Sequence, residues 1–286
     1  MIEFIKVIIL GIVEGITEWL PVSSTGHLIL VDEFLTLDAS DEFKEMFEVV
    51  IQLGAIIAVV VLYWNKLFPF GRKNNEYPLR SEGIGAYIKT DIFKMWFKVL
   101  VACLPAAVIG LLFDDLFNEL FYNWQTVAVM LIVFGVFFIV VEKKNKERKP
   151  QFNSIEQMPY CVVVMIGMFQ LLAAVFPGTS RSGATIVGAL IIGVSRVAAA
   201  EFTFYLAVPV MFGASLLKLV KFFAASGSMT GTEAVMLLLG MAVAFGVSIL
   251  VIRFLMNYIK KHDFTVFGWY RIILGALVLV YFGLIA

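Results

Sequence analysis

Residues 158–194 read MPYCVVVMIGMFQLLAAVFPGTSRSGATIVGALIIGV, an apolar stretch that is interrupted in its middle by PGTSRSG. The stretch is long enough to enter a bilayer, because a spanning helix needs about 20 mostly apolar residues. Its centre is too polar to face lipid, since each unsatisfied backbone N–H or C=O in hydrocarbon costs roughly 2 to 7 kcal/mol. We therefore expect a helix–loop–helix hairpin that enters the membrane, turns back and keeps its loop enclosed by protein.

A second stretch, residues 2–31, has the same organisation, with PVSSTG at its break. Composition agrees with a membrane protein, because 61% of the 286 residues are hydrophobic, 15% are charged and the mean hydropathy is +0.93. The sequence thus predicts an all-α integral membrane protein, a single domain over residues 1–286, with six transmembrane helices and two re-entrant hairpins. The six unbroken apolar segments are 46–64, 94–113, 121–141, 202–222, 233–254 and 268–285.

The distribution of charged residues argues against a nucleic-acid partner and predicts which loops lie on each side of the membrane. Basic and acidic residues number 22 each, so no net charge points to nucleic acid, and the implied partners are membrane lipids. The loops 65–93 and 142–157 carry five basic residues each, which predicts a cytoplasmic location. The segments 32–45 and 114–120 hold one basic residue between them, and we expect them outside. Alternation through six spans then requires the two hairpins to enter from opposite sides.

The two broken stretches also resemble each other in sequence. We expect inverted repeats over about 1–141 and 158–286, joined by the basic cytoplasmic loop 142–157, as in inverted-repeat membrane folds. The alternative is that short patterns of Pro, Ser and Thr recur by chance. A shift of 156 positions pairs Gly11 with Gly167, Glu14 with Gln170, Pro21 with Pro177, Ser23 with Thr179 and Ser24 with Ser180.

Two acidic residues precede the first break. Glu14 and Glu18 are four positions apart, so their carboxylates lie on one helix face about one turn apart. A carboxylate at membrane depth costs roughly 2.5 kcal/mol or more, which implies a wet cavity, a cation or a bound proton. The alternative is that both residues lie at the interface and face water.

Hydroxyl residues follow at the break. Ser23, Ser24 and Thr25 stand where a second helix begins, and Ser or Thr commonly caps such a start. For Ser23 and Thr25 we prefer this capping role. Ser24 has Glu18 and His27 nearby in sequence, which makes it a candidate nucleophile with a base and an acid within reach.

The second break carries Arg181, a cation that cannot lose its proton in the membrane. A guanidinium binds phosphate oxygens in pairs, and Gly178 and Gly183 allow backbone to approach closely. A structural salt bridge from Arg181 to Glu14 or Glu18 is the competing account. Together the breaks predict phosphate-ester or diphosphate chemistry on an amphiphile, with Mg²⁺ held by carboxylates and substrate phosphates.

Two motifs carry a resemblance to a known family. EGITEWLPVSSTGHL (Glu14 to Leu28) and PGTSRSGAT (Pro177 to Thr185) resemble the signatures of the undecaprenyl-diphosphate phosphatase family, integral-membrane enzymes associated with bacitracin resistance. Trp19 stands where the family more often has Phe. The resemblance implies removal of the terminal phosphate from a C55 polyprenyl diphosphate in the bacterial plasma membrane, which regenerates the carrier for cell-wall polymers.

The resemblance also implies roles for residues. Glu14 and Glu18 would activate the nucleophile or bind a divalent cation, Mg²⁺ or Ca²⁺. Ser24 would be the nucleophile and His27 its acid/base partner, and attack by the histidine instead is the alternative within the family. Arg181 would hold the diphosphate. Entry of the first hairpin from outside predicts an active site that opens to the outer, periplasmic side. Architecture alone would also suit a transporter or polyprenyl-phosphate flippase. The supporting substrate contacts would be Ser23, Thr25, Gly178, Ser180 and Ser182.

Overall fold

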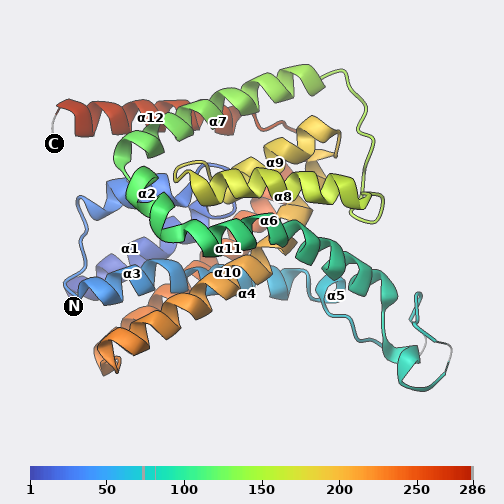
Figure 1. Cartoon of the computed structure of the whole chain (residues 1–286), viewed down its shortest axis with the longest axis horizontal. Helices are drawn as coiled ribbons and strands as arrows, with labels where there is room; N and C mark the ends of the chain where they lie inside the picture. Colours follow the sequence, from blue (N-terminus) through green and yellow to red (C-terminus); the bar gives the residue numbers. More distant parts are fainter. Residues whose placement is uncertain (73–74, 81, 285–286) are drawn as a thin grey trace.

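The computed structural model describes residues 1–72, 75–80 and 82–284, and over these residues it is a helical protein with three isolated β-bridges and no longer strand. Figure 1 shows the helices stacked side by side. The first half contains α1 (Ile2–Thr17), α2 (Ser24–Asp32), α3 (Asp41–Val50), α4 (Gln52–Leu62), α5 (Trp64–Leu67), the 3₁₀ helix η1 (Gly83–Tyr87), α6 (Thr90–Phe121) and α7 (Trp124–Asn145). The second half contains α8 (Tyr160–Val175), α9 (Arg181–Ile192), α10 (Arg196–Ser226), α11 (Gly231–Tyr258) and α12 (Thr265–Leu284).

All six predicted spans are confirmed as apolar helical segments long enough to cross a membrane, within the described ranges. The first span, Asp41–Leu62, combines α3 and α4, which meet at Ile51. Most helices begin earlier than predicted because polar caps extend them. Thr230, for example, forms a capping box with Glu233 at the start of α11.

One predicted loop is wrong. Residues 114–120 are helical, because α6 continues to Phe121 before the chain turns. The segment 111–121 contains neither Gly nor Pro, so nothing in it ends the helix. The turn comes at Tyr122 and Asn123, and the Asn123 side chain accepts a hydrogen bond from the Thr126 N–H (2.8 Å) to begin α7.

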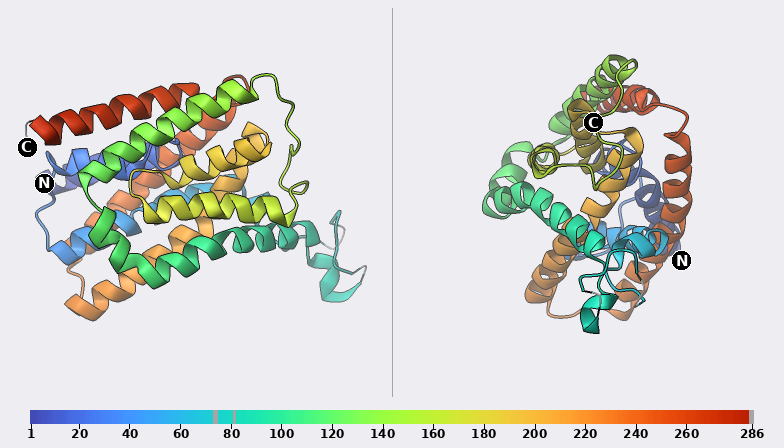
Figure 2. Two further views of the ribbon diagram at one scale, coloured as in Figure 1. Left: turned by 45° about the horizontal axis from the view of Figure 1, so that its top comes forward. Right: turned by 90° about the vertical axis from the view of Figure 1, so that its right-hand side faces the viewer.

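The loops sort by charge at the two ends of the bundle. In Figure 1 and in the left view of Figure 2, the described parts of the first basic loop, residues 65–72, 75–80 and 82–89, lie at the same end as the basic loop 146–159. The N-terminus and the end of α12 lie at the opposite end in both views. Loops expected on one side of a membrane are therefore grouped at one end of the molecule.

The two broken stretches form two short helix pairs, α1 with α2 and α8 with α9. The first pair extends inward from the end that holds the N-terminus, and the second pair extends inward from the end that holds the loop 146–159 (Figure 1). The helices have 16 and 9 residues in the first pair and 16 and 12 in the second. At 1.5 Å per residue all four are shorter than the roughly 30 Å hydrocarbon layer.

The longer helices enclose these pairs. α1 packs against α11, α8 packs against α6, and α7 packs against α12. α10 contacts α3, α4, α6 and α9, so it crosses both halves. This packing brings the break of each helix pair into the interior of the bundle.

Candidate active site

The two breaks have the same local structure. Ser23 and Ser180 are the N-caps of α2 and α9, with φ angles of 74° and 68°. The Ser23 side chain accepts a hydrogen bond from the Gly26 N–H (3.3 Å), and Ser180 accepts one from the Gly183 N–H (3.1 Å). In the part of the chain that the structure describes, no other non-glycine residue has a positive φ. Such a conformation persists only where the surroundings fix it, often at functional sites.

This geometry corrects the register of the sequence repeat. The shift of 156 holds before the break, but the two caps are 157 positions apart. The reason is one extra residue between the proline and the cap serine, since Pro177 is followed by Gly and Thr whereas Pro21 is followed by Val alone. Ser24 therefore occupies the position of Arg181, and not that of Ser180 as the sequence comparison predicted.

Glu18, directly after α1, connects the two breaks. Its Oε2 accepts a hydrogen bond from the Ser24 hydroxyl (3.3 Å), and its Oε1 forms an ion pair with Arg181. The Ser182 hydroxyl donates to the Glu18 backbone carbonyl (3.3 Å). Hydroxyl, carboxylate and guanidinium groups from elements 163 positions apart in sequence are thus in contact.

These groups border a cavity of about 190 Å³. One Arg181 nitrogen, Nη1, is buried and has no hydrogen-bond partner in the described structure. A buried guanidinium N–H without an acceptor favours an anion beside it. The polar lining comes from Thr17, Glu18, Ser24, Thr25, Gln52, Ser180, Arg181 and Ser182, and the apolar lining from Ala173, Pro177, Gly178, Val210, Met211 and Ala214.

Glu14 lies one turn before Glu18 on α1 and is fully buried. Neither of its carboxylate oxygens has a hydrogen-bond partner in the described residues. A bound proton or a cation would satisfy such a group. No cluster of three or more His, Cys, Asp and Glu side chains occurs over the same residues. Two carboxylates such as Glu14 and Glu18 are a donor set that Mg²⁺ accepts where substrate and water supply its other oxygens.

His27 faces away from this cavity. Its Nδ1 lies 2.7 Å from the Ser23 carbonyl oxygen, which can only accept, so Nδ1 carries the proton. Nε2 then accepts from the Tyr270 hydroxyl at 2.7 Å, and the two rings are stacked with centroids 5.6 Å apart. The imidazole therefore connects the strained start of α2 to α12.

Gly178 borders the cavity and also meets a packing requirement. Its φ is +86°, and a Cβ placed there would lie 2.5 Å from the Val127 carbonyl oxygen on α7. No larger residue fits without moving the backbone. Ser23 is likewise buried, which agrees with the capping role expected for it.

The sequence analysis missed Arg271. This residue of α12 is fully buried and donates to the backbone carbonyls of Pro21 (3.2 Å), Gly178 (2.9 Å) and Thr179 (2.8 Å). It therefore joins the loops of both breaks. A signal was present, because an arginine inside the predicted span 268–285 is expensive in a membrane and usually marks a functional or structural centre.

Gln52 and the apolar wall of α10 were also missed. Gln52 lines the cavity at the start of α4, and Val210, Met211 and Ala214 face it from α10. Gln52 could have been noticed, because it is a polar side chain inside the predicted apolar span 46–64. The sequence context of Val210, Met211 and Ala214 does not distinguish them from other apolar residues of α10. Only the packing of the helices brings them to the breaks.

The fold and the cavity define a multi-pass membrane protein whose broken helices enclose a site suited to an anion. Residues 7–277 match the family described as "Bacitracin resistance protein BacA", and the chain belongs to that family. It is 62% identical over 283 residues to an undecaprenyl-diphosphatase of Desulfitobacterium hafniense, covering 99% of this chain and 97% of the relative. It is 59% identical over 281 residues to undecaprenyl-diphosphatase 1 of Clostridium acetobutylicum, covering 98% of both chains. An undecaprenyl-diphosphatase of Enterococcus faecalis is 60% identical over 279 residues, covering 98% of this chain and 97% of the relative.

Arg271→Met should destabilise the protein. The substitution leaves the carbonyls of both loops without their donor, which should cost at least about 2 kcal/mol and lower the melting temperature by roughly 5 °C or more in detergent. Arg253→Met is the control, because it removes an exposed arginine from the neighbouring helix α11. Equal melting temperatures for the two variants would contradict the role assigned to Arg271.

Proposed function

We propose that this chain hydrolyses undecaprenyl diphosphate to undecaprenyl phosphate and inorganic phosphate. The reaction recycles the lipid carrier for cell-wall synthesis and confers resistance to bacitracin. The observation that carries the proposal is the contact of Glu18 with both Ser24 and Arg181 at one cavity. The names of relatives that match nearly the whole chain support the same activity.

In this proposal Arg181 binds the terminal phosphate through its unpaired Nη1 and the supporting contacts come from the residues around it. These are the hydroxyls of Ser180, Ser182 and Thr25 and the backbone near Gly178, all on the cavity wall, with Ser23 holding the start of α2. The first-turn N–H groups of α2 and α9 add partial positive charge. The apolar wall of α10 faces the same cavity and suits the isoprenoid chain.

Ser24 then attacks the terminal phosphorus while Glu18 accepts the hydroxyl proton along the existing hydrogen bond. The bond from that phosphorus to the bridging oxygen breaks, and undecaprenyl phosphate leaves with the bridging oxygen. Water hydrolyses the resulting phosphoserine and releases inorganic phosphate. Arg181 neutralises charge on the phosphoryl oxygens throughout.

A divalent cation, Mg²⁺ or Ca²⁺, completes the proposed site. Glu14 and Glu18 would hold it, and it would neutralise charge on the diphosphate. The buried Glu14 carboxylate, whose oxygens lack other partners among the described residues, supports this assignment.

The proposed architecture is a single membrane domain built from inverted repeats over about 1–141 and 158–286, with α1–α2 and α8–α9 as re-entrant hairpins. Entry of the two pairs from opposite ends of the bundle supports it (Figure 1). So does equivalent packing, because a Cβ on Gly11 would lie 2.9 Å from the Gly240 carbonyl of α11, and one on Gly167 would lie 2.4 Å from the Ala102 carbonyl of α6.

The proposed location is the bacterial plasma membrane, with the active site open to the outer, periplasmic side. The basic loops are grouped at the end of the bundle opposite the N-terminus, which supports that orientation because basic loops favour the cytoplasmic side (Figure 1). The architecture is also compatible with a transporter or polyprenyl-phosphate flippase. An assay of phosphate release distinguishes the hydrolase from either of these transport proteins. Purified protein in detergent, without a gradient, should release inorganic phosphate from a polyprenyl diphosphate, whereas a transporter should release none.

Substitution of the nucleophile tests the mechanism. Ser24→Ala should lower turnover at least about 10³-fold, because no group remains to form the covalent intermediate. His27→Ala should cost at most about 10²-fold, since it only loosens the start of α2. Phosphate release measures both, and acid-quenched protein analysed by mass spectrometry should carry phosphate on Ser24.

Ser228→Ala, in an exposed loop, is the control for that experiment and should keep normal turnover. Phosphate found on His27, or a larger loss in His27→Ala than in Ser24→Ala, would assign the attack to the histidine instead.

Removal of divalent ions tests the cation site. Chelation should abolish phosphate release, and added Mg²⁺ or Ca²⁺ should restore it. In Glu14→Gln the ion concentration for half-maximal activity should rise at least about tenfold, because one carboxylate ligand is lost. Full activity in chelator would rule the cation out of the reaction.

Cysteine labelling in intact cells tests the orientation. The parent for this experiment carries Cys103→Ala and Cys161→Ala, which removes both native thiols. A membrane-impermeant maleimide should label Ala39→Cys, and it should label Lys146→Cys only after permeabilisation. The reverse pattern would place the active-site opening on the cytoplasmic side.

A further inference from the structure

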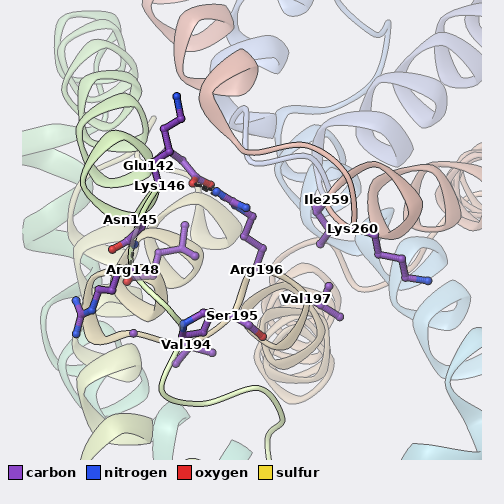
Figure 3. Close-up of a pocket in the computed structure, with 13 residues that line it drawn as sticks. Glu142, Asn145, Lys146, Arg148, Val194, Ser195, Arg196, Val197, Ile259 and Lys260 are labelled. Atoms are coloured by element: carbon purple, nitrogen blue, oxygen red, sulfur yellow. Dashed lines mark hydrogen bonds and ion pairs between the residues drawn. The ribbon is translucent and has the colours of Figure 1, made fainter.

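A second cavity, of about 340 Å³, lies at the far end of α9 and α10 from the candidate active site. It is bounded by the ends of α7 and α11, the turn after α9 and the start of α10 (Figure 3). α9 begins at Arg181 and has 12 residues, so the two cavities are separated by about 18 Å along this helix. The second cavity therefore belongs to the end of the bundle that holds the basic loops.

The lining of this cavity is strongly basic. Four cationic residues, Lys146, Arg148, Arg196 and Lys260, contribute to it, and Glu142 is the one acidic residue. The buried Glu142 carboxylate binds Arg196 at 2.5 to 3.1 Å and accepts the Phe264 N–H at 3.0 Å. The negative charge of Glu142 is therefore neutralised by Arg196 and does not offset the other cations. Figure 3 shows this pair between the helices.

The other three cations have no acidic partner in the described part of the chain. Arg148 donates one hydrogen bond, to the Ile191 carbonyl (3.3 Å), and neither Lys146 nor Lys260 makes a hydrogen bond or ion pair there. In Figure 3, Arg148 and Lys260 lie on opposite sides of the Glu142–Arg196 pair. Their charged ends point outward, so these three side chains stand at the rim of the cavity (Figure 3). Positive charges at the rim of a cavity attract an anion to its mouth.

The start of α10 adds backbone donors to the same cavity. Ser195 caps the helix through the Ala198 N–H (3.4 Å), and the N–H groups of Arg196 and Val197 have no partner in the described structure. The first turn of α10 contains no acidic residue. By contrast, α3 has Asp41 and Glu42 in its first turn, and their negative charges interact favourably with the positive N-terminal end of the α3 dipole.

Apolar side chains complete the lining, namely Leu190, Val194, Val197 and Ile259. We infer that this cavity binds the phosphate group of an anionic membrane lipid from the leaflet next to the basic loops. The α10 N–H groups contact the phosphate oxygens and the cations at the rim balance the phosphate charge, while the apolar residues contact the glycerol and the first methylenes. Basic pockets between transmembrane helices bind lipid headgroups in this way.

Melting temperatures in neutral detergent test the inference with a matched pair of variants. The site variant is Lys146→Gln with Lys260→Gln, and the control is Lys143→Gln with Lys261→Gln, which removes two positive charges from the same segments outside the cavity lining. Phosphatidylglycerol, and not phosphatidylcholine, should stabilise the parent and the control. The phosphatidylglycerol concentration for half the effect should rise about tenfold or more in the site variant.

A parallel titration with inorganic phosphate, against sodium chloride at equal ionic strength, identifies the source of the phosphate group. Stabilisation by phosphate that the site variant alone loses would support the site with free phosphate as its ligand. Equal loss in both variants, or no preference for phosphatidylglycerol or phosphate, would overturn the inference. If the site variant fails to fold in phosphatidylcholine micelles, Lys146→Gln is compared with Lys143→Gln in the same assay.

Discussion

The site depends on one ion pair, that of Glu18 with Arg181. Each partner carries a charge that the membrane interior disfavours, and each comes from a different broken helix. Buried alone, either charge would be costly, whereas together they hold the two breaks in contact. The same pair leaves one Arg181 nitrogen without a partner in the described structure, and both Arg181 and Ser24 line the cavity, so the contact that stabilises the fold also favours an anion site.

Arg271 makes this arrangement rigid by a different physical means. It has no carboxylate partner among the described residues, and it donates to loop carbonyls from both breaks and to carbonyls of α7. The loop carbonyls belong to non-helical backbone that would otherwise be unpaired in a water-poor interior. Burial of one cation is therefore offset by several hydrogen bonds, and the loops gain a fixed relative position that a catalytic geometry requires.

Sequence periodicity and composition predicted the six spans and both breaks, because long apolar runs and polar interruptions have few solutions in a membrane. The ion pair of Arg181 was foreseen only as a competing account, with Glu14 or Glu18 as its partner, and the coordinates select Glu18. The sequence could not separate Ser24 from His27, since both are one turn or less from the same cap. Only the coordinates orient the histidine toward Tyr270. The α10 wall could not be predicted for a related reason, because its place at the cavity comes from helix packing and not from any local pattern.

The corrected register explains how a repeated fold can produce one site instead of two. Under the proposed repeat, both halves supply a strained cap serine and a helix start that faces the centre. The positions around them differ, because Ser24 is matched by Arg181, and Glu14 and Glu18 are matched by Gln170 and Ala174. One half therefore provides the hydroxyl and the carboxylates, and the other provides the cation. Two identical halves would have placed like charges opposite each other, so the sequence divergence at these few positions is what makes a complementary, charge-balanced site at the centre of the bundle.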